Sequence, residues 1–161
     1  MTTASIAVIA AVIIGLLAEF YIRLVIPLRR NKFPRIGAFW AEHGGIFAGI
    51  VAGENGAPDY FLIHATPDHE LFDIDWNNSV ESAQSPINGL TDWSLPNRRE
   101  ARLLEINCHD SFDLDSWYWT SEQSARNGGY AWMQGFGFGD QDVDRKSDKC
   151  RARAVRRVFI I

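Results

Sequence analysis

The chain has 161 residues, which is enough for one domain and too short for two of ordinary size. Apolar residues make up 47% of it and charged residues 22%, a balance that excludes an intrinsically disordered chain. The net charge of −4 divides unevenly, because residues 1–36 carry +4 and the remainder therefore −8. An acidic body lacks the basic face of a nucleic-acid-binding domain, so we expect no nucleic-acid partner.

The first thirty residues predict a membrane anchor. Residues 4–22 read ASIAVIAAVIIGLLAEFYI, an apolar run with a single glutamate, and about 20 such residues cross the hydrocarbon core of a bilayer. Five Lys or Arg residues follow within residues 23–35, and none precedes the run. We therefore expect residues 1–30 to form a hydrophobic membrane-anchor helix that contacts membrane lipid over residues 4–28.

The rest of the chain divides into a short basic linker, residues 31–35, and one domain, residues 36–161. The positive-inside rule would keep this domain on the cytoplasmic side. Two alternatives to the anchor stay open. A cleavable signal peptide normally begins with basic residues, which MTTAS lacks, and a buried helix within an oligomeric assembly would need no lipid.

The domain begins with a predicted β-hairpin. Residues 44–53 alternate glycine with β-branched and aromatic residues, and residues 60–65 form a second apolar run after a turn-rich segment. His64 lies in that run, and no second His or Cys stands at metal-ligand spacing, so we interpret it as a core histidine. Residues 75–89 predict a short helix that ends before Pro86.

The stretch TDWSLPNRRE, residues 91–100, predicts a turn followed by a capped helix. Asn97 and Glu100 have the spacing of a capping box, and Pro96 favours an extended backbone before it. The helix would continue through RREARLLEIN. Its candidates for the inner side are Ala101, Leu103, Leu104 and Ile106. The residues interpreted as structural are Trp93, Pro96, Asn97, Glu100, Trp119 and Trp132.

The last third of the domain has the pattern of strands, over residues 116–122, 130–139 and 150–160. The arginines of the last strand are expected to be solvated. They are Arg151, Arg153, Arg156 and Arg157. Cys108 and Cys150 fit no metal spacing, and both a disulfide and two free buried thiols stay open.

An acidic segment, residues 139–148, follows a Gly- and Phe-rich one. Asp140, Asp142 and Asp144 have the spacing of a calcium loop, but Arg145 and Arg151 stand where an EF-hand requires Gly and Glu. We expect a solvated acidic loop without metal or cofactor, although another oxygen-rich cation site stays open. Aromatic rings beside carboxylates suit a sugar or a peptide. The candidate ligand-binding residues are therefore Phe136, Phe138, Asp140, Asp142 and Asp144.

Residues 44–65, GGIFAGIVAGENGAPDYFLIHA, look like the leading hairpin of the phage and prophage branch of the Lcl C-terminal domain family, and four ordered motifs after it resemble those of the family. They are Asp92-Trp93-Ser94-Leu95-Pro96 with Glu100, Trp119-Thr120-Ser121, Ala131-Trp132 with Phe136 and Gly139, and Arg153-Ala154-Val155-Arg156. Two positions depart from the family pattern, with Ser94 in place of the usual Arg and Thr120 in place of the usual Ser. The resemblance spans residues 36–160.

The resemblance implies an α+β fold, a C-type-lectin-like domain with short helices and antiparallel strands. It further implies a binding surface on the late loops, residues 123–129 and 137–148, and an adhesive rather than catalytic role. No nucleophile–base–orienter set is evident in the sequence. We therefore expect no enzyme, but a non-catalytic, membrane-anchored binding or adhesion module of phage or prophage origin.

The resemblance and the anchor together set the expected partners and location. The ligand would be a protein or a glycan, and the protein would lie in a single pass in a bacterial host inner membrane or a virion. The alternative is a structural virion component whose N-terminal helix inserts into a viral membrane or a multimeric assembly. Its partners would then be further copies of the chain or other virion proteins.

Overall fold

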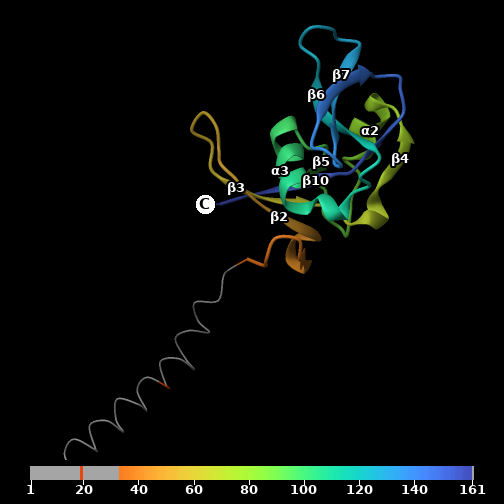
Figure 1. Ribbon diagram of the computed structural model, residues 1–161. Coiled ribbons are helices and arrows are strands. Elements are labelled where there is room, and N and C mark those ends of the chain that lie inside the picture. Colours follow the sequence, from red (N-terminus) through yellow and green to blue (C-terminus); the bar gives the residue numbers. More distant parts are fainter. Residues whose placement is uncertain (1–18, 20–32, 161) are drawn as a thin grey trace, which may run out of the picture. The chain divides into compact units, whose positions relative to one another are not determined.

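The computed structural model describes Glu19 and residues 33–160 (Figure 1). The predicted anchor helix, residues 1–30, and residues 31–32 of the linker after it therefore lie outside the described residues, Glu19 apart. In the part of the chain that the structure does describe, no helix combines the length and the apolar character needed to cross a membrane. Residues 34–161 form one compact unit.

The domain has an α+β architecture with ten strands in two five-stranded sheets. The first sheet has the order β1-β2-β3-β10-β5, with bounds Phe39–Trp40, Gly45–Val51, Tyr60–His64, Val155–Phe159 and Trp93–Ser94. The second has the order β4-β9-β6-β7-β8, with bounds Leu71–Ile74, Cys150–Ala152, Trp117–Gln123, Tyr130–Gly135 and Gln141–Arg145. All strand pairs are antiparallel except β6 with β9.

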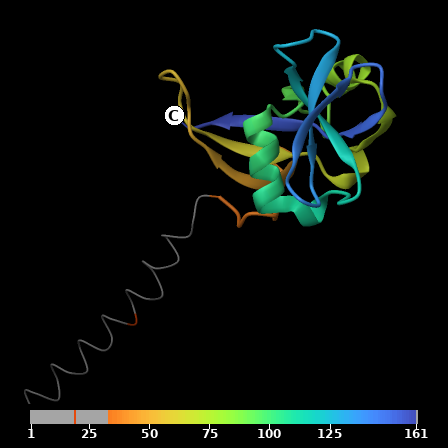
Figure 2. The same cartoon turned by 45° about the horizontal axis from the view of Figure 1, so that its top comes forward.

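Two α-helices and three short 3₁₀ helices complete the described part. They are α2 (Trp76–Ser82), α3 (Arg98–Cys108), η1 (Ala41–His43), η2 (Pro67–His69) and η3 (His109–Ser111). Helix α3 packs against β2 of the first sheet and against β6 and β7 of the second (Figure 2). The two sheets therefore share one core, in which Leu104 of α3 lies with Leu62, Tyr118 and Val155 of the strands.

The predicted hairpin is present as β2 and β3. Its register shifts between Phe47 and Gly49, where Gly49 has a φ of +138°. A side chain at this position would be strained, and its Cβ would lie 3.0 Å from the side-chain amide nitrogen of Asn107. The bulge therefore depends on glycine, and it allows α3 to pack closely on β2.

Helix α3 begins with the predicted capping box. The Glu100 amide donates to Asn97 Oδ1 at 2.8 Å, and the Asn97 amide donates to Glu100 Oε2 at 2.7 Å. Ala101 and Leu104 face inward as predicted, but Ile106 is 63% exposed. The prediction for Ile106 is wrong because the inner stripe of α3 continues from Leu104 at the four-residue interval of a helix, to Cys108.

Glu100 does more than cap its helix. Its carboxylate is fully buried and accepts hydrogen bonds from the Tyr60 hydroxyl at 2.7 Å and from Arg157 Nε and Nη2, both at 2.6 Å. Burial, and the Glu100 carboxylate beside it, raise the pKa of Tyr60 to about 12, so this hydroxyl stays a donor at neutral pH. One carboxylate thus joins α3 to β3 and β10.

A second buried carboxylate, Glu70, joins the segment before β4 to β9. It accepts from Arg151 Nη1 at 2.7 Å, from the Tyr118 hydroxyl at 3.0 Å and from Arg153, whose guanidinium also lies over the Phe112 ring. Arg153 is 4% exposed.

The expectation of solvated arginines near the C-terminus is therefore wrong. Arg151 and Arg153 pair with Glu70, Arg157 pairs with Glu100, and Arg156 pairs with Asp92 at 2.5 Å. The acids lie 57 to 83 residues earlier in the chain. Their proximity arises from strand pairing, which a count of local charges does not reveal.

We expect Glu100→Ala to lower the free energy of unfolding by about 3–5 kcal/mol, because it leaves Arg157 buried without its carboxylate. Denaturant unfolding followed by tryptophan fluorescence measures the loss. The matched control is Glu54→Ala, which removes a 70% exposed partner of Arg99 and should cost less than about 1 kcal/mol. Equal losses in the two variants would contradict the role assigned to Glu100.

The buried His64 makes the stability of the fold depend on pH. Its side chain is fully buried, Nδ1 is 2.9 Å from the Ala65 carbonyl oxygen, and Nε2 has no hydrogen-bond partner in the described structure. Burial lowers the pKa of His64 to about 4. The folded protein therefore favours the neutral imidazole ring. The contribution of this preference to the free energy of unfolding is fully present above pH 6.5 and is lost as the pH falls toward 4.

We expect the His64→Leu variant to lose roughly 3 kcal/mol less free energy of unfolding on acidification than the parent protein. This amount corresponds to the difference between the pKa of His64 in the unfolded and in the folded chain. The measurement is the free energy of unfolding at several pH values between 4 and 7.5, for both proteins. An unchanged slope in the variant would show that other groups cause the acid sensitivity.

Candidate functional site

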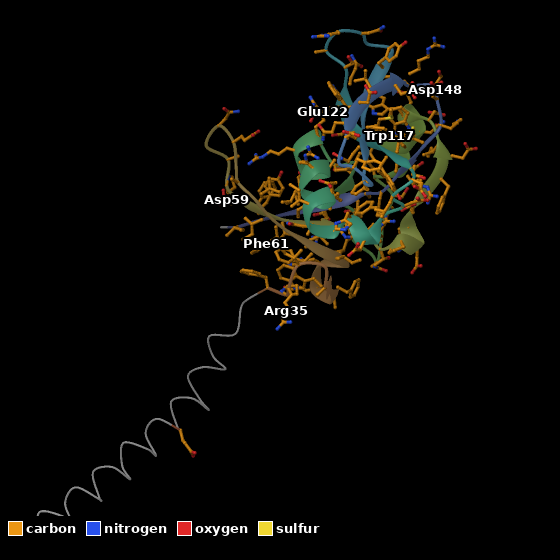
Figure 3. The ribbon with its side chains drawn as sticks, in the orientation of Figure 1. Arg35, Asp59, Phe61, Trp117, Glu122 and Asp148 are labelled. Atoms are coloured by element: carbon orange, nitrogen blue, oxygen red, sulfur yellow. The ribbon has the colours of Figure 1, made fainter. Side chains whose placement is uncertain are left out.

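The second sheet has an inner face toward α3 and an outer face turned away from it. Directly paired residues share a face, so the pairs Trp117↔Gly135, Trp119↔Met133, Met133↔Asp142 and Ala131↔Asp144 place six side chains and Gly135 on the outer face. The neighbouring Tyr118 and Gln134 face inward, and both are buried. Figure 3 shows Trp117 in the half of the domain that β6 and β7 form.

The outer face contains an open hollow of about 500 Å³. All five strands of the second sheet and residues that flank them contribute to its walls. Side chains that line it are Phe72, Trp117, Met133, Asp144, Lys149 and Arg151. Phe72 is 61% exposed and lies under the Arg151 guanidinium, 4.9 Å from its ring centroid. The hollow therefore combines exposed aromatic rings with both signs of charge.

A second hollow, of about 230 Å³, adjoins the first at Ser116 and Trp117, which line both. Phe138, which is 96% exposed, and Asp140 form its far wall with Leu114. We call the lining of the two hollows together the Trp117 surface.

The Trp117 ring is supported from below by its strand partner. A Cβ on Gly135 would lie 3.4 to 3.6 Å from three ring carbons, so the ring rests on the glycine backbone. The ring therefore packs over the glycine, and Trp117 stays partly exposed. An aromatic ring held in this way is available for stacking at little conformational cost.

Four of the five predicted ligand-binding residues lie on this face of the second sheet or line its hollows, and the fifth lies in the core. Phe138 and Asp140 line the second hollow, Asp144 lines the first, and Asp142 lies on the same face. Phe136 is 3% exposed and stacks on Phe112 with ring centroids 3.9 Å apart. Its prediction as a ligand-binding residue is corrected, because it continues the alternation of β7 and points into the core.

The predicted acidic loop is largely a strand, β8, at the edge of the second sheet. Hydrogen bonds from Gly135 N to Asp140 O and from Lys146 N to Gly129 O fix the ladder between β7 and β8. By the alternation of an antiparallel ladder, the amides of Val143 and Arg145 then point away from β7.

Those two outward amides are capped by the preceding aspartates. The Val143 amide donates to Asp142 Oδ1 and the Arg145 amide to Asp144 Oδ1, both at 2.8 Å. Capped donors and charged side chains reduce the tendency of an edge strand to pair with another chain. The alternating aspartates therefore protect this edge.

The thiol beside the first hollow stays protonated at neutral pH. Burial raises the pKa of Cys150 to about 11, and Asp144 and Asp148 add to the effect. Burial also raises the pKa of Cys108 in α3 to about 11, and both cysteines are free. Lys149 pairs with Asp75 at 3.0 Å. Neither thiol has the lowered pKa of a nucleophile or a metal ligand.

No group of three or more His, Cys, Asp or Glu side chains in the described structure could hold a metal ion. Asp140 lines the second hollow, whereas Asp142 and Asp144 each bond a backbone amide of β8. The segment whose aspartates have the spacing of a calcium loop thus forms a strand.

Sequence reasoning missed Phe72, Trp117, Lys149 and Arg151 as members of this surface. One signal was present, because alternation within SWYWTSE places Trp117 on the same face as Trp119. The other three come from segments before α2 and around β9, and only the pairing of β4 with β9 and of β9 with β6 brings them here.

A comparison with protein-family models identifies the domain. The model of the Lcl C-terminal domain matches residues 56–156, which is more than half of the chain. The protein belongs to the Lcl C-terminal domain family. The match includes β3 through β9 and leaves out β1 and β2. No curated protein matches the chain.

The two positions that depart from the pattern of the Lcl C-terminal domain family, Ser94 and Thr120, both form hydrogen bonds to other elements of the fold. Ser94 Oγ accepts a hydrogen bond from Arg157 Nη1 at 2.6 Å, so a guanidinium from β10 lies beside this position. Thr120 Oγ1 donates to the Trp132 carbonyl at 2.9 Å. Arg98 covers the Trp132 ring at 3.5 Å from its centroid. These motif residues join elements of the fold.

We expect the double variant Asp142→Ala, Asp144→Ala to self-associate as its concentration rises, because the β8 edge loses its capped amides and charges. Light scattering of the purified chain in detergent measures its mass. The control, Asp68→Ala with Glu81→Ala, removes the same charge from two exposed positions elsewhere. If both variants keep the mass of the parent protein, the edge-protecting role is wrong.

Proposed function

We propose that this member of the Lcl C-terminal domain family is a non-catalytic binding module on a single-pass membrane anchor, and that the Trp117 surface binds its ligand. The observation that carries the proposal is the partly exposed Trp117 ring, which packs over Gly135 and lines two adjoining hollows. Binding sites typically combine such rigid aromatic groups with a few polar ones.

A glycan or a polar protein segment fits the chemistry of the Trp117 surface. A pyranose ring can stack on Trp117 while its hydroxyls donate to Asp144 or Asp140. Lys149 and Arg151 supply donors at the other side of the first hollow. The two hollows in series favour an extended ligand over a small compact one.

The groups nearest to this surface support binding over catalysis. The Cys150 thiol is held protonated, and the buried His64 is fully shielded from solvent. Arg151 is engaged by Glu70 and Asp113. A C-type-lectin-like fold and a phage or prophage origin belong to the same proposal, supported by the family membership and by two sheets with a ligand surface on the late strands.

The alternative is a structural virion component, either embedded in a viral membrane or part of a multimeric assembly. The apolar run of residues 4–22 favours it as much as it favours an anchored receptor. In that case the Trp117 surface would bind another virion protein or a second copy of the chain.

We expect Trp117→Ala combined with Asp144→Ala to weaken ligand binding at least about tenfold, because it removes the central ring and an acceptor. Full-length protein in lipid nanodiscs would be tested on a glycan array and on intact bacterial cells. The control is Phe39→Ala, which removes a 54% exposed ring from β1 of the first sheet.

Binding that survives in the double variant would exclude the Trp117 surface as the ligand site. Binding by the parent protein to neither probe, together with its recovery in purified particles, would favour the virion component. Circular dichroism of the variants separates loss of the surface from loss of the fold.

A further inference from the structure

A second exposed surface lies between β2 and α3. It is a groove of about 320 Å³ lined by Ile50, Val51, Ala52, Leu103 and Ile106, with Arg99 and Arg102 at its rim. Ile50 is 46% exposed and Ile106 is 63% exposed. We call it the Ile106 groove. Val51 also belongs to the core and Leu103 packs against it, whereas Ile50 and Ile106 point to solvent.

The chain enters the domain beside this groove. Gly37 N donates to Phe47 O at 2.8 Å and Phe47 N donates to Ala38 O at 3.0 Å, so residues 37–38 run along β2. Ile36 is 51% exposed and lies with Leu103 over Gly49. Ile36 therefore extends the apolar groove toward the N-terminal segment.

The segment between the apolar run and the domain is short. Ile22, at the end of the run, precedes Ile36 by 14 residues, which can span at most about 50 Å even when fully extended. If residues 4–22 cross a bilayer, the domain is tethered within that distance of the membrane surface.

The charges near the groove suit an anionic surface. Arg35 lies at the end of the domain where the chain enters and points away from the sheet (Figure 3). The residues before it add Arg29, Arg30 and Lys32. Arg99 and Arg102 pair with Glu54 and Glu105, so the basic excess comes mainly from the linker. Basic residues beside a membrane segment attract anionic lipid headgroups.

We propose that the Ile106 groove docks on the anionic lipid surface beside the anchor. Ile36, Ile50 and Ile106 enter the boundary between headgroups and acyl chains, and the basic linker lies at the phosphates. This inference rests on the membrane anchor of the proposed function. Docking through α3 and β2 leaves the outer face of the second sheet turned away from the lipid, so the Trp117 surface remains accessible.

The size of the groove favours lipid over a second copy of the chain. Seven residues line it, whereas a stable protein interface usually involves about 20–30 residues on each side. An amphipathic surface that is already tethered needs far less area to stay on a bilayer, because its local concentration there is high.

The test uses the full-length chain in vesicles of phosphatidylcholine with or without phosphatidylglycerol. An environment-sensitive fluorophore is attached to Ile106→Cys in a Cys150→Ser background, where Cys108 stays buried. Lipids spin-labelled near the headgroup should quench at least about half of its fluorescence in the anionic vesicles, since docked side chains sit at that depth. The same fluorophore on Arg126→Cys, in the exposed β6–β7 turn, should stay unquenched.

A third protein carries the fluorophore at position 106 together with Ile36→Ser and Ile50→Ser, both at exposed positions. It should float with the vesicles as before but lose the quenching. Flotation without quenching of the Ile106→Cys probe would overturn the docking while leaving the anchor intact. A blue shift of the probe's emission that grows with protein concentration, without quenching by the spin-labelled lipid, would indicate that a second copy covers the groove. That result would also overturn the lipid docking. Failure to float would overturn the anchor and the docking together.

Discussion

The fold depends on one buried carboxylate, that of Glu100. It caps α3 by bonding the Asn97 amide, and it neutralises Arg157 of β10 while accepting from Tyr60 of β3. A buried charge is tolerated only when its partners satisfy it fully. Helix α3 and the first sheet are therefore placed by the same group, and an error in either position would leave a charge unpaired.

Glu70 repeats this arrangement in the second sheet, with Arg151, Arg153 and Tyr118 as its partners. The two carboxylates receive arginines from β9, β10 and the link between them, so the C-terminal segment is held along most of its length. Its position in turn supports the Trp117 surface, because β9 pairs with β6 and supplies Arg151 to the first hollow. Contacts beneath the Trp117 surface thus fix the strands that form it.

The two exposed surfaces of the domain have different chemistry. The Trp117 surface is aromatic and carries both signs of charge, whereas the Ile106 groove is aliphatic and has a basic approach through the linker. Aromatic rings with adjacent acceptors suit a polar ligand with flat apolar faces. Aliphatic side chains beside basic residues suit a membrane surface. The two surfaces lie on different elements, the Trp117 surface on the second sheet and the loops beside it, and the Ile106 groove on β2 and α3.

The sequence by itself determined the local elements. The capping box at Asn97, the β2–β3 hairpin, the strands after residue 116 and the family motifs all follow from short-range patterns, because caps, turns and alternation involve neighbouring residues. Only the tertiary structure decided which side chains meet. It turned Phe136 inward, exposed Ile106, made the acidic loop the edge strand β8 and paired the C-terminal arginines with Glu70 and Glu100. Phe72, Trp117 and Lys149 likewise gather only after β4, β6 and β9 align. Strand order and register set these contacts, and no local pattern in the sequence encodes the distance between segments that are many residues apart.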